Sequence, residues 1–288
     1  MSTVDEILKA AGLSASEIAS AKDHQMVRGV KQSADDRDLA AWFCFLVEAD
    51  SDKCREVFIT SSGRAKNPSV KQMGHLNQDG EEASAEVDGD DDPFAGFRLE
   101  PNGDAAAKEY LTAKPGSCGM LNLSKEEMDK FAALPRGASK ADVESVLRQV
   151  FMGRLQEYKQ RGLEGISPYC RGKGKNFEPG KELSHKSSIL PTCEKIAPEF
   201  VKYLKEYPNS KPDGVEEAFT WVNFIEDDKP NICLVHKIGM NVEGAGYVFS
   251  QRHFYVSRGH NSVQGVGGAF PVSDDETLVL YVSRTSTE

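Results

Sequence analysis

Apolar residues recur at three- and four-residue steps in several segments before position 210, and this spacing predicts amphipathic helices. The clearest segment is Ala141–Arg161, which Gly162 ends. Its apolar positions fall on one side of a helix and are expected to face a core: Val143, Val146, Leu147, Val150, Phe151, Leu155 and Tyr158. This segment is therefore predicted to be the main helix of the fold.

Capping residues mark the start of other predicted helices. Ser14 precedes Glu17, and Ser124 precedes Glu127, at the spacing of a capping box. Asp and Ser open the segment DSDKCREVFIT, and Pro198 opens PEFVKYLKEY. The helices predicted besides the long one span Val4–Ala11, Ser14–Val30, Asp50–Thr60, Lys125–Leu134 and Pro198–Tyr207.

Strand patterns begin with the aromatic-rich segment Leu39–Glu48 and dominate the chain after Pro212. There, β-rich runs are separated by DDKP, by EGAG and by the glycine-rich HNSVQGVGGAF. The runs are Phe219–Phe224, Asn231–Val242, Tyr247–Arg258 and Thr277–Thr285. Short turns between successive strands indicate an antiparallel meander. We predict an α+β fold, with N-terminal helices and a strand, then a mostly antiparallel C-terminal meander packed on the long helix.

Composition fits one globular unit, and we predict a single domain over residues 1–288. The chain is 39 % hydrophobic and 28 % charged, with a net charge of −10. Eight acidic residues and no basic residue lie between Lys71 and Arg98, so we expect a disordered acidic loop over about 76–93. The Gly/Lys-rich stretch 171–180 is expected to be a solvated connector. The acidic balance argues against nucleic acid as a partner.

The chain lacks the common enzyme signatures, such as GxSxG, HExxH and GxGxxG. Its longest apolar run, Leu39–Val47, is too short to cross a bilayer, and no secretory signal opens the chain. A cytoplasmic location is expected, with a removed signal left open. The six cysteines have no metal-site spacing, so free thiols are favoured over one or two disulfides. We expect no metal and no cofactor, and a calcium loop at DGDDD is set aside because Pro93 and Leu99 break its pattern.

Several stretches resemble an uncharacterised family of bacterial proteins. They are APEFVKYLKEYPNSKPDGVEEAFTWVNF, KPNICLVHKIG, QRHFYVSRGHNS, LVLYVSRTSTE, LSASEIASAK and KPGSCGMLNLS. The resemblance implies a sheet similar to that of START-type helix-grip proteins, which enclose an apolar ligand between a curved sheet and a long helix. Two features of the chain depart from the family pattern. Ala113 stands where the family tends to have a cysteine, a possible partner for Cys118, and no helix follows the last strand, so Ala141–Arg161 would have to cover the sheet.

Strand alternation gives the candidate site residues. His236 falls on an apolar strand face, and Gln251, His253, Tyr255 and Ser257 share a face of the next run. An apolar interior with a few polar anchors is typical of a small-molecule site. Arg252 and Arg258 are expected to be exposed, and His236 alone is more often a satisfied core histidine. The predicted ligand-binding residues are Trp221, His236, Gln251, His253, Tyr255 and Tyr281.

We therefore expect non-catalytic binding of an apolar or amphipathic small molecule between the C-terminal sheet and a helix. An enzyme (lyase, cyclase or hydrolase) using His236, His253 and Tyr255 as acid–base groups is the alternative. A protein-interaction module working through the acidic loop is a third possibility. A zinc site of His236, His253 and His260 is considered and set aside, because nothing in the sequence fixes their mutual distances. The sequence leaves the oligomeric state open.

Overall fold

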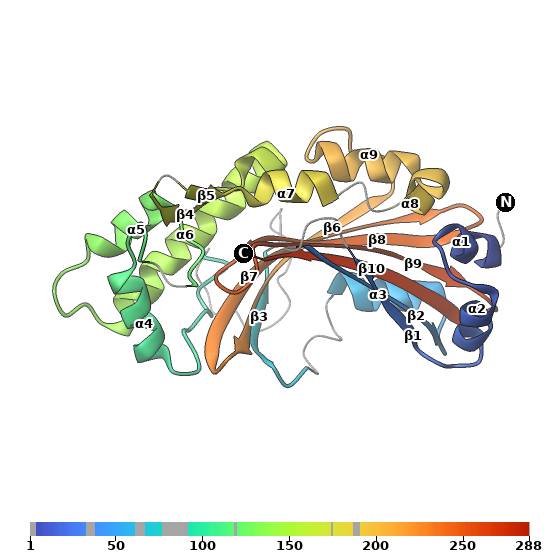
Figure 1. Cartoon of the computed structure of the whole chain (residues 1–288), viewed down its shortest axis with the longest axis horizontal. Coiled ribbons are helices and arrows are strands. Elements are labelled where there is room, and N and C mark those ends of the chain that lie inside the picture. The colour runs from blue at the N-terminus through green and yellow to red at the C-terminus, as the bar shows by residue number, and fades with distance from the viewer. Residues whose placement is uncertain are drawn as a thin grey trace.

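An eight-stranded antiparallel sheet lies at the centre of the molecule, with helices on both of its faces (Figure 1). The computed structural model describes residues 4–32, 38–60, 67–76, 92–117, 120–173, 175–186 and 191–287. The strand order is β1-β2-β10-β9-β8-β7-β6-β3. The strands are β1 (Val27–Gln32), β2 (Asp38–Val47), β3 (Val70–His75), β6 (Val215–Glu226), β7 (Lys229–Val242), β8 (Gly246–Val256), β9 (Ser262–Pro271) and β10 (Thr277–Ser286). The predicted α+β class with an antiparallel meander is confirmed.

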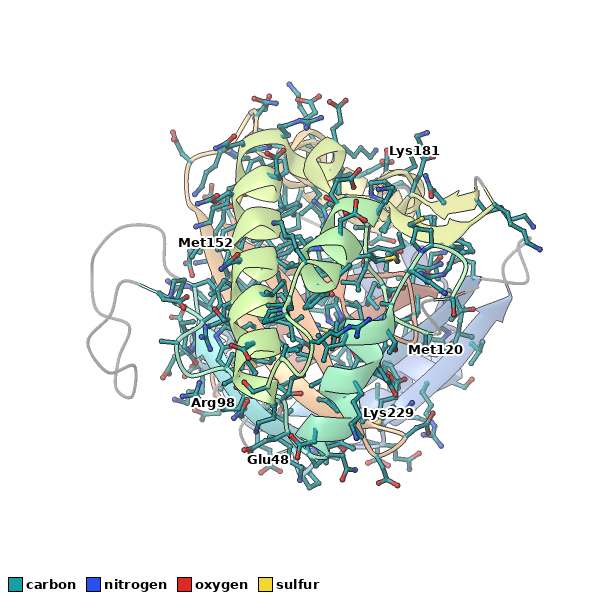
Figure 2. The ribbon with its side chains drawn as sticks, turned by 90° about the vertical axis from the view of Figure 1, so that its left-hand side faces the viewer. Glu48, Arg98, Met120, Met152, Lys181 and Lys229 are labelled. Carbon is teal, nitrogen blue, oxygen red and sulfur yellow. The ribbon has the colours of Figure 1, made fainter. Side chains whose placement is uncertain are left out.

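Helices α6, α7 and α9 lie over one face of the sheet, and α3 lies against the other (Figure 1). Viewed from the end in Figure 2, α6 runs beside α4 and α5, and the strands lie behind them. The helices are α1 (Val4–Ala10), α2 (Ala15–Lys22), α3 (Ser51–Thr60), α4 (Gly103–Thr112), α5 (Lys125–Ala132), α6 (Lys140–Arg161), α7 (Pro179–Lys186), α8 (Pro191–Ile196) and α9 (Pro198–Glu206). None of these helices is long and apolar enough to span a bilayer. We call the two sides of the sheet the α6 face and the α3 face.

The α6 face carries the main core, as the spacing within Ala141–Arg161 predicts. Leu147 and Phe151 of α6 are fully buried, and Val150 and Leu155 are nearly so. Phe151 is in contact with the ring of Phe97, at 5.1 Å between centroids, and with that of Tyr255, at 5.9 Å. The long helix is therefore held on the sheet by its apolar stripe, and Ser139 with Asp142 caps its start.

The capping boxes predicted at Ser14 and Ser124 are confirmed, each with the expected glutamate three residues on. The helix after Ser14 is shorter than predicted, because it ends at Lys22 and the chain continues as β1. In β1, Gly29 pairs with Trp42 of β2, and a side chain at Gly29 would collide with the Trp42 ring. Pairing with β2 therefore overrides the helical spacing that continues to Val30.

The glycine-rich segment after His260 is a central strand, and its prediction as a separator between strands is wrong. Residues Ser262–Pro271 form β9, between β8 and β10, and nine of these ten residues are buried. A Cβ atom at Gly265 would lie 1.8 Å from the Tyr281 hydroxyl, and one at Gly268 would lie 2.3 Å from the Phe270 ring. The glycines are needed because aromatic side chains lie across the strand.

The predicted connector at 171–180 is also wrong in part. Tyr169–Gly172 (β4) and Lys175–Phe177 (β5) form a hairpin, and α7 begins at Pro179. Arg171 donates hydrogen bonds to the Leu121 carbonyl and the Asn122 side chain, which ties the hairpin to the chain before α5. Of the predicted acidic loop, residues 77–91 lie outside the described residues. Leu76, at its start, is buried.

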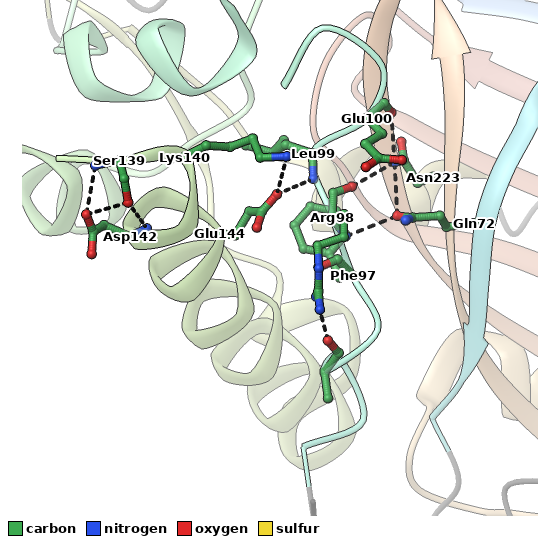
Figure 3. A network of polar contacts seen from close by, with 11 residues as sticks. Gln72, Phe97, Arg98, Leu99, Glu100, Ser139, Lys140, Asp142, Glu144 and Asn223 are labelled. Atoms are coloured by element: carbon green, nitrogen blue, oxygen red, sulfur yellow. Dashed lines mark hydrogen bonds and ion pairs between the residues drawn. The ribbon is translucent and has the colours of Figure 1, made fainter. Parts of the chain in front are cut away.

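The chain after the acidic stretch is fastened between α6 and the sheet (Figure 3). The Leu99 amide donates to Glu144 of α6 at 2.8 Å. On the other side, the Asn223 side chain of β6 donates to the carbonyls of Arg98, at 3.2 Å, and Glu100, at 3.1 Å. This polar bracket fixes one end of α6 relative to β6.

Candidate functional site

A β-bulge at Phe254 decides which side chains share a face of the sheet. Leu234 pairs with Tyr255, but the next residue of β7, Val235, pairs with His253. Because neighbouring residues of β7 point to opposite faces, Tyr255 lies on the α6 face and His253 on the α3 face. The prediction that Gln251, His253 and Tyr255 share a face is therefore wrong.

The predicted ligand-binding residues fall into two groups on opposite faces of the sheet. Trp221, His236 and Tyr255 lie on the α6 face. Gln251, His253 and Tyr281 lie on the α3 face, where Tyr281 stacks against Phe249 with 6.1 Å between ring centroids. His236 pairs with Arg252 and does not meet His253 or Tyr255 across the strands.

His236 occupies a closed polar network on the α6 face. Its side chain is fully buried, with Nδ1 2.9 Å from the Tyr158 hydroxyl and Nε2 2.9 Å from Glu217 Oε1. The same carboxylate accepts hydrogen bonds from Tyr203 and Lys211. Both ring nitrogens therefore have protein partners, and His236 has the environment of a satisfied core histidine.

Arg252 extends this network, and the prediction that Arg252 and Arg258 are exposed is wrong. Arg252 is fully buried, and its guanidinium donates to Gln264, to the Tyr158 hydroxyl and to the Leu204 carbonyl. Arg258, 4 % exposed, pairs with Glu109 at 2.9 Å. Charge in a strand signals exposure only when that face of the sheet meets water, and here helices cover both faces.

The pKa values of Glu217 and His236 decide which groups of this network donate hydrogen bonds at neutral pH. Burial raises the pKa of Glu217, but hydrogen bonds from His236 and Lys211 outweigh it and lower the pKa to about 2. Burial lowers the pKa of His236 to about 4, although Glu217 opposes this shift. The imidazole is therefore neutral beside a carboxylate. Nε2–H then donates to Glu217, and Nδ1 accepts from Tyr158, whose oxygen accepts from Arg252.

A second buried polar group on the α6 face, the Arg154 cluster, is only partly paired. It consists of Glu127, Arg154, Tyr169 and Tyr255. Arg154 donates from Nη2 to Glu127 at 2.6 Å, and its guanidinium carbon lies 4.2 Å from the centre of the Tyr255 ring. Arg154 Nε and Nη1 and the Tyr255 hydroxyl are buried and make no hydrogen bond to any residue that the structure describes.

Aromatic rings lead from the Arg154 cluster to Trp221. Trp221 contacts Phe97 at 5.9 Å between centroids, and Phe97 and Tyr255 flank the ring of Phe151. Thus two of the predicted residues, Trp221 and Tyr255, belong to one continuous row of aromatic side chains, and the Arg154 guanidinium lies beside Tyr255 at its end. Polar side chains in an apolar surround are the usual composition of a small-molecule site.

Sequence reasoning missed most of these polar groups. Arg154 lies four residues after Val150 and four before Tyr158, inside the apolar stripe of α6. A charged residue in such a stripe is a detectable signal of a buried ion pair. Glu217 and Arg252 gave no comparable signal, because charges alternate with apolar residues in exposed strands as well.

A separate cavity of about 580 Å³ lies at the β7–β8 turn. It is lined by parts of α1, α3, this turn and the end of β9, and by none of the predicted ligand-binding residues. Comparison of the chain with protein-family models, with curated proteins and with solved structures gave no match.

Proposed function

We propose that the protein binds an amphipathic small molecule between its sheet and α6, with a hydrogen-bond-accepting end of the molecule at the Arg154 cluster. The observation that carries this proposal is the pair of unpartnered nitrogens on buried Arg154 beside the unpartnered hydroxyl of Tyr255. A buried polar group without a partner costs about 1–3 kcal/mol. A bound acceptor would remove this cost.

The charge of the cluster favours an acidic or carbonyl-bearing end. Burial lowers the pKa of Arg154, but the Glu127 carboxylate and the neighbouring tyrosines raise it by more, so the guanidinium stays charged. Glu127 occupies one nitrogen of the guanidinium and leaves Nε and Nη1. The rings of Phe151 and Trp221 would contact the apolar part of the molecule.

The test is native mass spectrometry of the gently purified protein, followed by titration of the delipidated protein with a fluorescent fatty acid. We expect a co-purified small molecule on the wild type. Tyr255→Phe removes one hydroxyl and keeps the ring, so it should weaken binding of the fluorescent fatty acid about threefold to tenfold.

Tyr247→Phe is the matched control, because Tyr247 on the α3 face is also fully buried and also has a hydroxyl without a partner among the described residues. It should bind the probe like the wild type. Equal binding by wild type and Tyr255→Phe, or no binding by the wild type, would contradict the proposal.

A further inference from the structure

Three metal-ligating side chains converge on the α3 face, away from the Arg154 cluster. They are Cys233 of β7, His253 of β8 and His260 of the loop between β8 and β9. One ligand atom from each residue lies within 4.8 Å of the other two. The two imidazole rings are 5.9 Å apart between centroids, at an interplanar angle of 44°.

The bulge at Phe254 brings about this convergence. It turns His253 to the face that carries Cys233, whose partner across the strands is Val256. His260 follows soon after the strand ends, and its backbone carbonyl accepts a hydrogen bond from Asn122 at 2.9 Å. Both histidine-bearing segments are therefore held in place by the fold.

The surroundings combine an apolar shell around Cys233 with two histidines that are partly buried. Cys233 is 1 % exposed and packs with Val235, Val256 and Phe224. His253 and His260 are only partly buried as whole residues, whereas His253 Nδ1 and His260 Nε2 are buried atoms. An apolar shell strengthens the bonds between a cation and its ligands by excluding water.

The donor set selects the class of ion. One thiolate and two imidazoles suit zinc and similar borderline-soft divalent ions, whereas calcium and magnesium require oxygen ligands. His253 also has an outer partner, because its Nε2 lies 3.0 Å from the side-chain nitrogen of Gln251. If the Gln251 amide is rotated so that its oxygen faces the ring, it accepts the Nε2–H, and Nδ1 becomes the metal ligand.

We propose that Cys233, His253 and His260 form a binding site for a zinc-like divalent cation. Three protein ligands leave the fourth position of a tetrahedral site to water or to an exogenous ligand, as in catalytic zinc centres. This set differs from the three-histidine site that was considered and set aside from the sequence, because His236 lies on the other face and Cys233 is the third ligand.

The test is titration of the reduced, metal-free, untagged full-length protein with Zn²⁺ against a chromophoric chelator, and with Co²⁺ as an optical probe. We expect one tight equivalent of Zn²⁺ and, with Co²⁺, a thiolate-to-metal charge-transfer band. Cys233→Ala should abolish this band. His260→Gln should weaken Zn²⁺ binding by more than the roughly 10- to 100-fold that loss of an outer partner costs, and Gln251→Ala should weaken it by about tenfold.

Two matched substitutions control for general effects. Cys44→Ala removes another buried sheet cysteine, and His24→Gln removes an exposed histidine; both variants should bind Zn²⁺ like the wild type. His260→Gln changes a partly exposed loop residue, so it tests the site even if Cys233→Ala does not fold. The proposal is overturned if the wild type binds no stoichiometric Zn²⁺, or if folded Cys233→Ala and His260→Gln bind it as tightly as the wild type.

Discussion

The two faces of the sheet hold histidines of the same meander in opposite ways. On the α6 face, His236 is fully buried, and both of its ring nitrogens have protein partners. On the α3 face, His253 and His260 are partly exposed and converge with Cys233. A buried imidazole with complete hydrogen bonding stabilises the fold, whereas metal-ligating side chains that converge from three positions are suited to bind an ion.

The same distinction appears between neighbours on α6. Tyr158 and Arg154 lie one helical turn apart, and both are buried against the sheet. The Tyr158 hydroxyl lies between His236 and Arg252, while Arg154 keeps two nitrogens without described partners. The His236 network and the Arg154 cluster lie in the same interior. They differ because both ring nitrogens of His236 have hydrogen-bond partners, whereas two nitrogens of Arg154 have none among the described residues.

Replacing His236 and His253 by alanine, each in its own variant, tests the difference between the two faces most strongly. His236→Ala leaves a cavity in the core and removes a hydrogen-bond partner from both Glu217 and Tyr158, so it should destabilise the fold by about 3–5 kcal/mol. His253→Ala, measured without metal, should cost about 1 kcal/mol or less because its side chain is partly exposed. Urea unfolding of both variants with a chelator present gives the values. Equal losses would show that the two faces do not differ in this way.

A substitution in α6 tests whether the α6 face depends on its apolar core as well as on its polar network. Leu147 is fully buried, so Leu147→Ala should leave a cavity in the core and destabilise the protein by about 2–5 kcal/mol. Gln149→Ala, at an exposed position of the same helix, is the control and should change stability by less than about 0.5 kcal/mol. A Leu147→Ala variant as stable as this control would remove α6 from the core.

The His236 network predicts a loss of stability in acid. The folded-state pKa of His236 is about 4 and the ordinary value is 6.5, so the unfolded chain takes up a proton first as the pH falls. The free energy of unfolding should therefore decrease from pH 6.5 to pH 4, by on the order of 3 kcal/mol from this group. Glu217, with a pKa lowered to about 2, extends the loss below pH 4.5.

The measurement is urea unfolding at several pH values for the wild type and His236→Gln. The variant should lose the part of the pH dependence between 6.5 and 4 while keeping the rest. His24→Gln, at an exposed histidine, should leave the pH profile as in the wild type. If His236→Gln and the wild type have parallel profiles over this range, His236 is not held neutral in the fold.

Local signals in the sequence were sufficient for elements whose start or side chains are set by near neighbours. The Ser124–Glu127 capping box is made within four residues, and the stripe of α6 is set by one helix. Strand β9 was missed because glycine is unfavourable in a strand on local grounds. Gly265 is needed there because Tyr281 of β10 lies across it, which is a tertiary property.

The candidate site was less predictable than the fold. One extra residue, Phe254, reverses the faces of the residues that precede it in β8 relative to Tyr255, and no residue type in QRHFYVS identifies a bulge. Strand alternation therefore grouped His253 with Tyr255, and it placed Arg252 in water. Cys233 is buried, and its proximity to His253 and His260 depends on this bulge.

The smallest expected effect compares two tyrosine hydroxyls on the α6 face, measured on refolded, ligand-free protein. Tyr158→Phe removes the partner of His236 Nδ1 and of Arg252, so it should destabilise the fold by about 1–3 kcal/mol. Tyr255→Phe removes a hydroxyl that has no partner among the described residues. Its free energy of unfolding should therefore stay within about 0.5 kcal/mol of the wild type or rise slightly, because an unpaired buried group is lost and the ring is kept.

Urea melts of both variants, with Tyr247→Phe as a buried control, measure the difference. A loss of stability in Tyr255→Phe as large as that in Tyr158→Phe would mean that the Tyr255 hydroxyl has a structural partner, and the Arg154 cluster would then be part of the closed network rather than a place for a ligand.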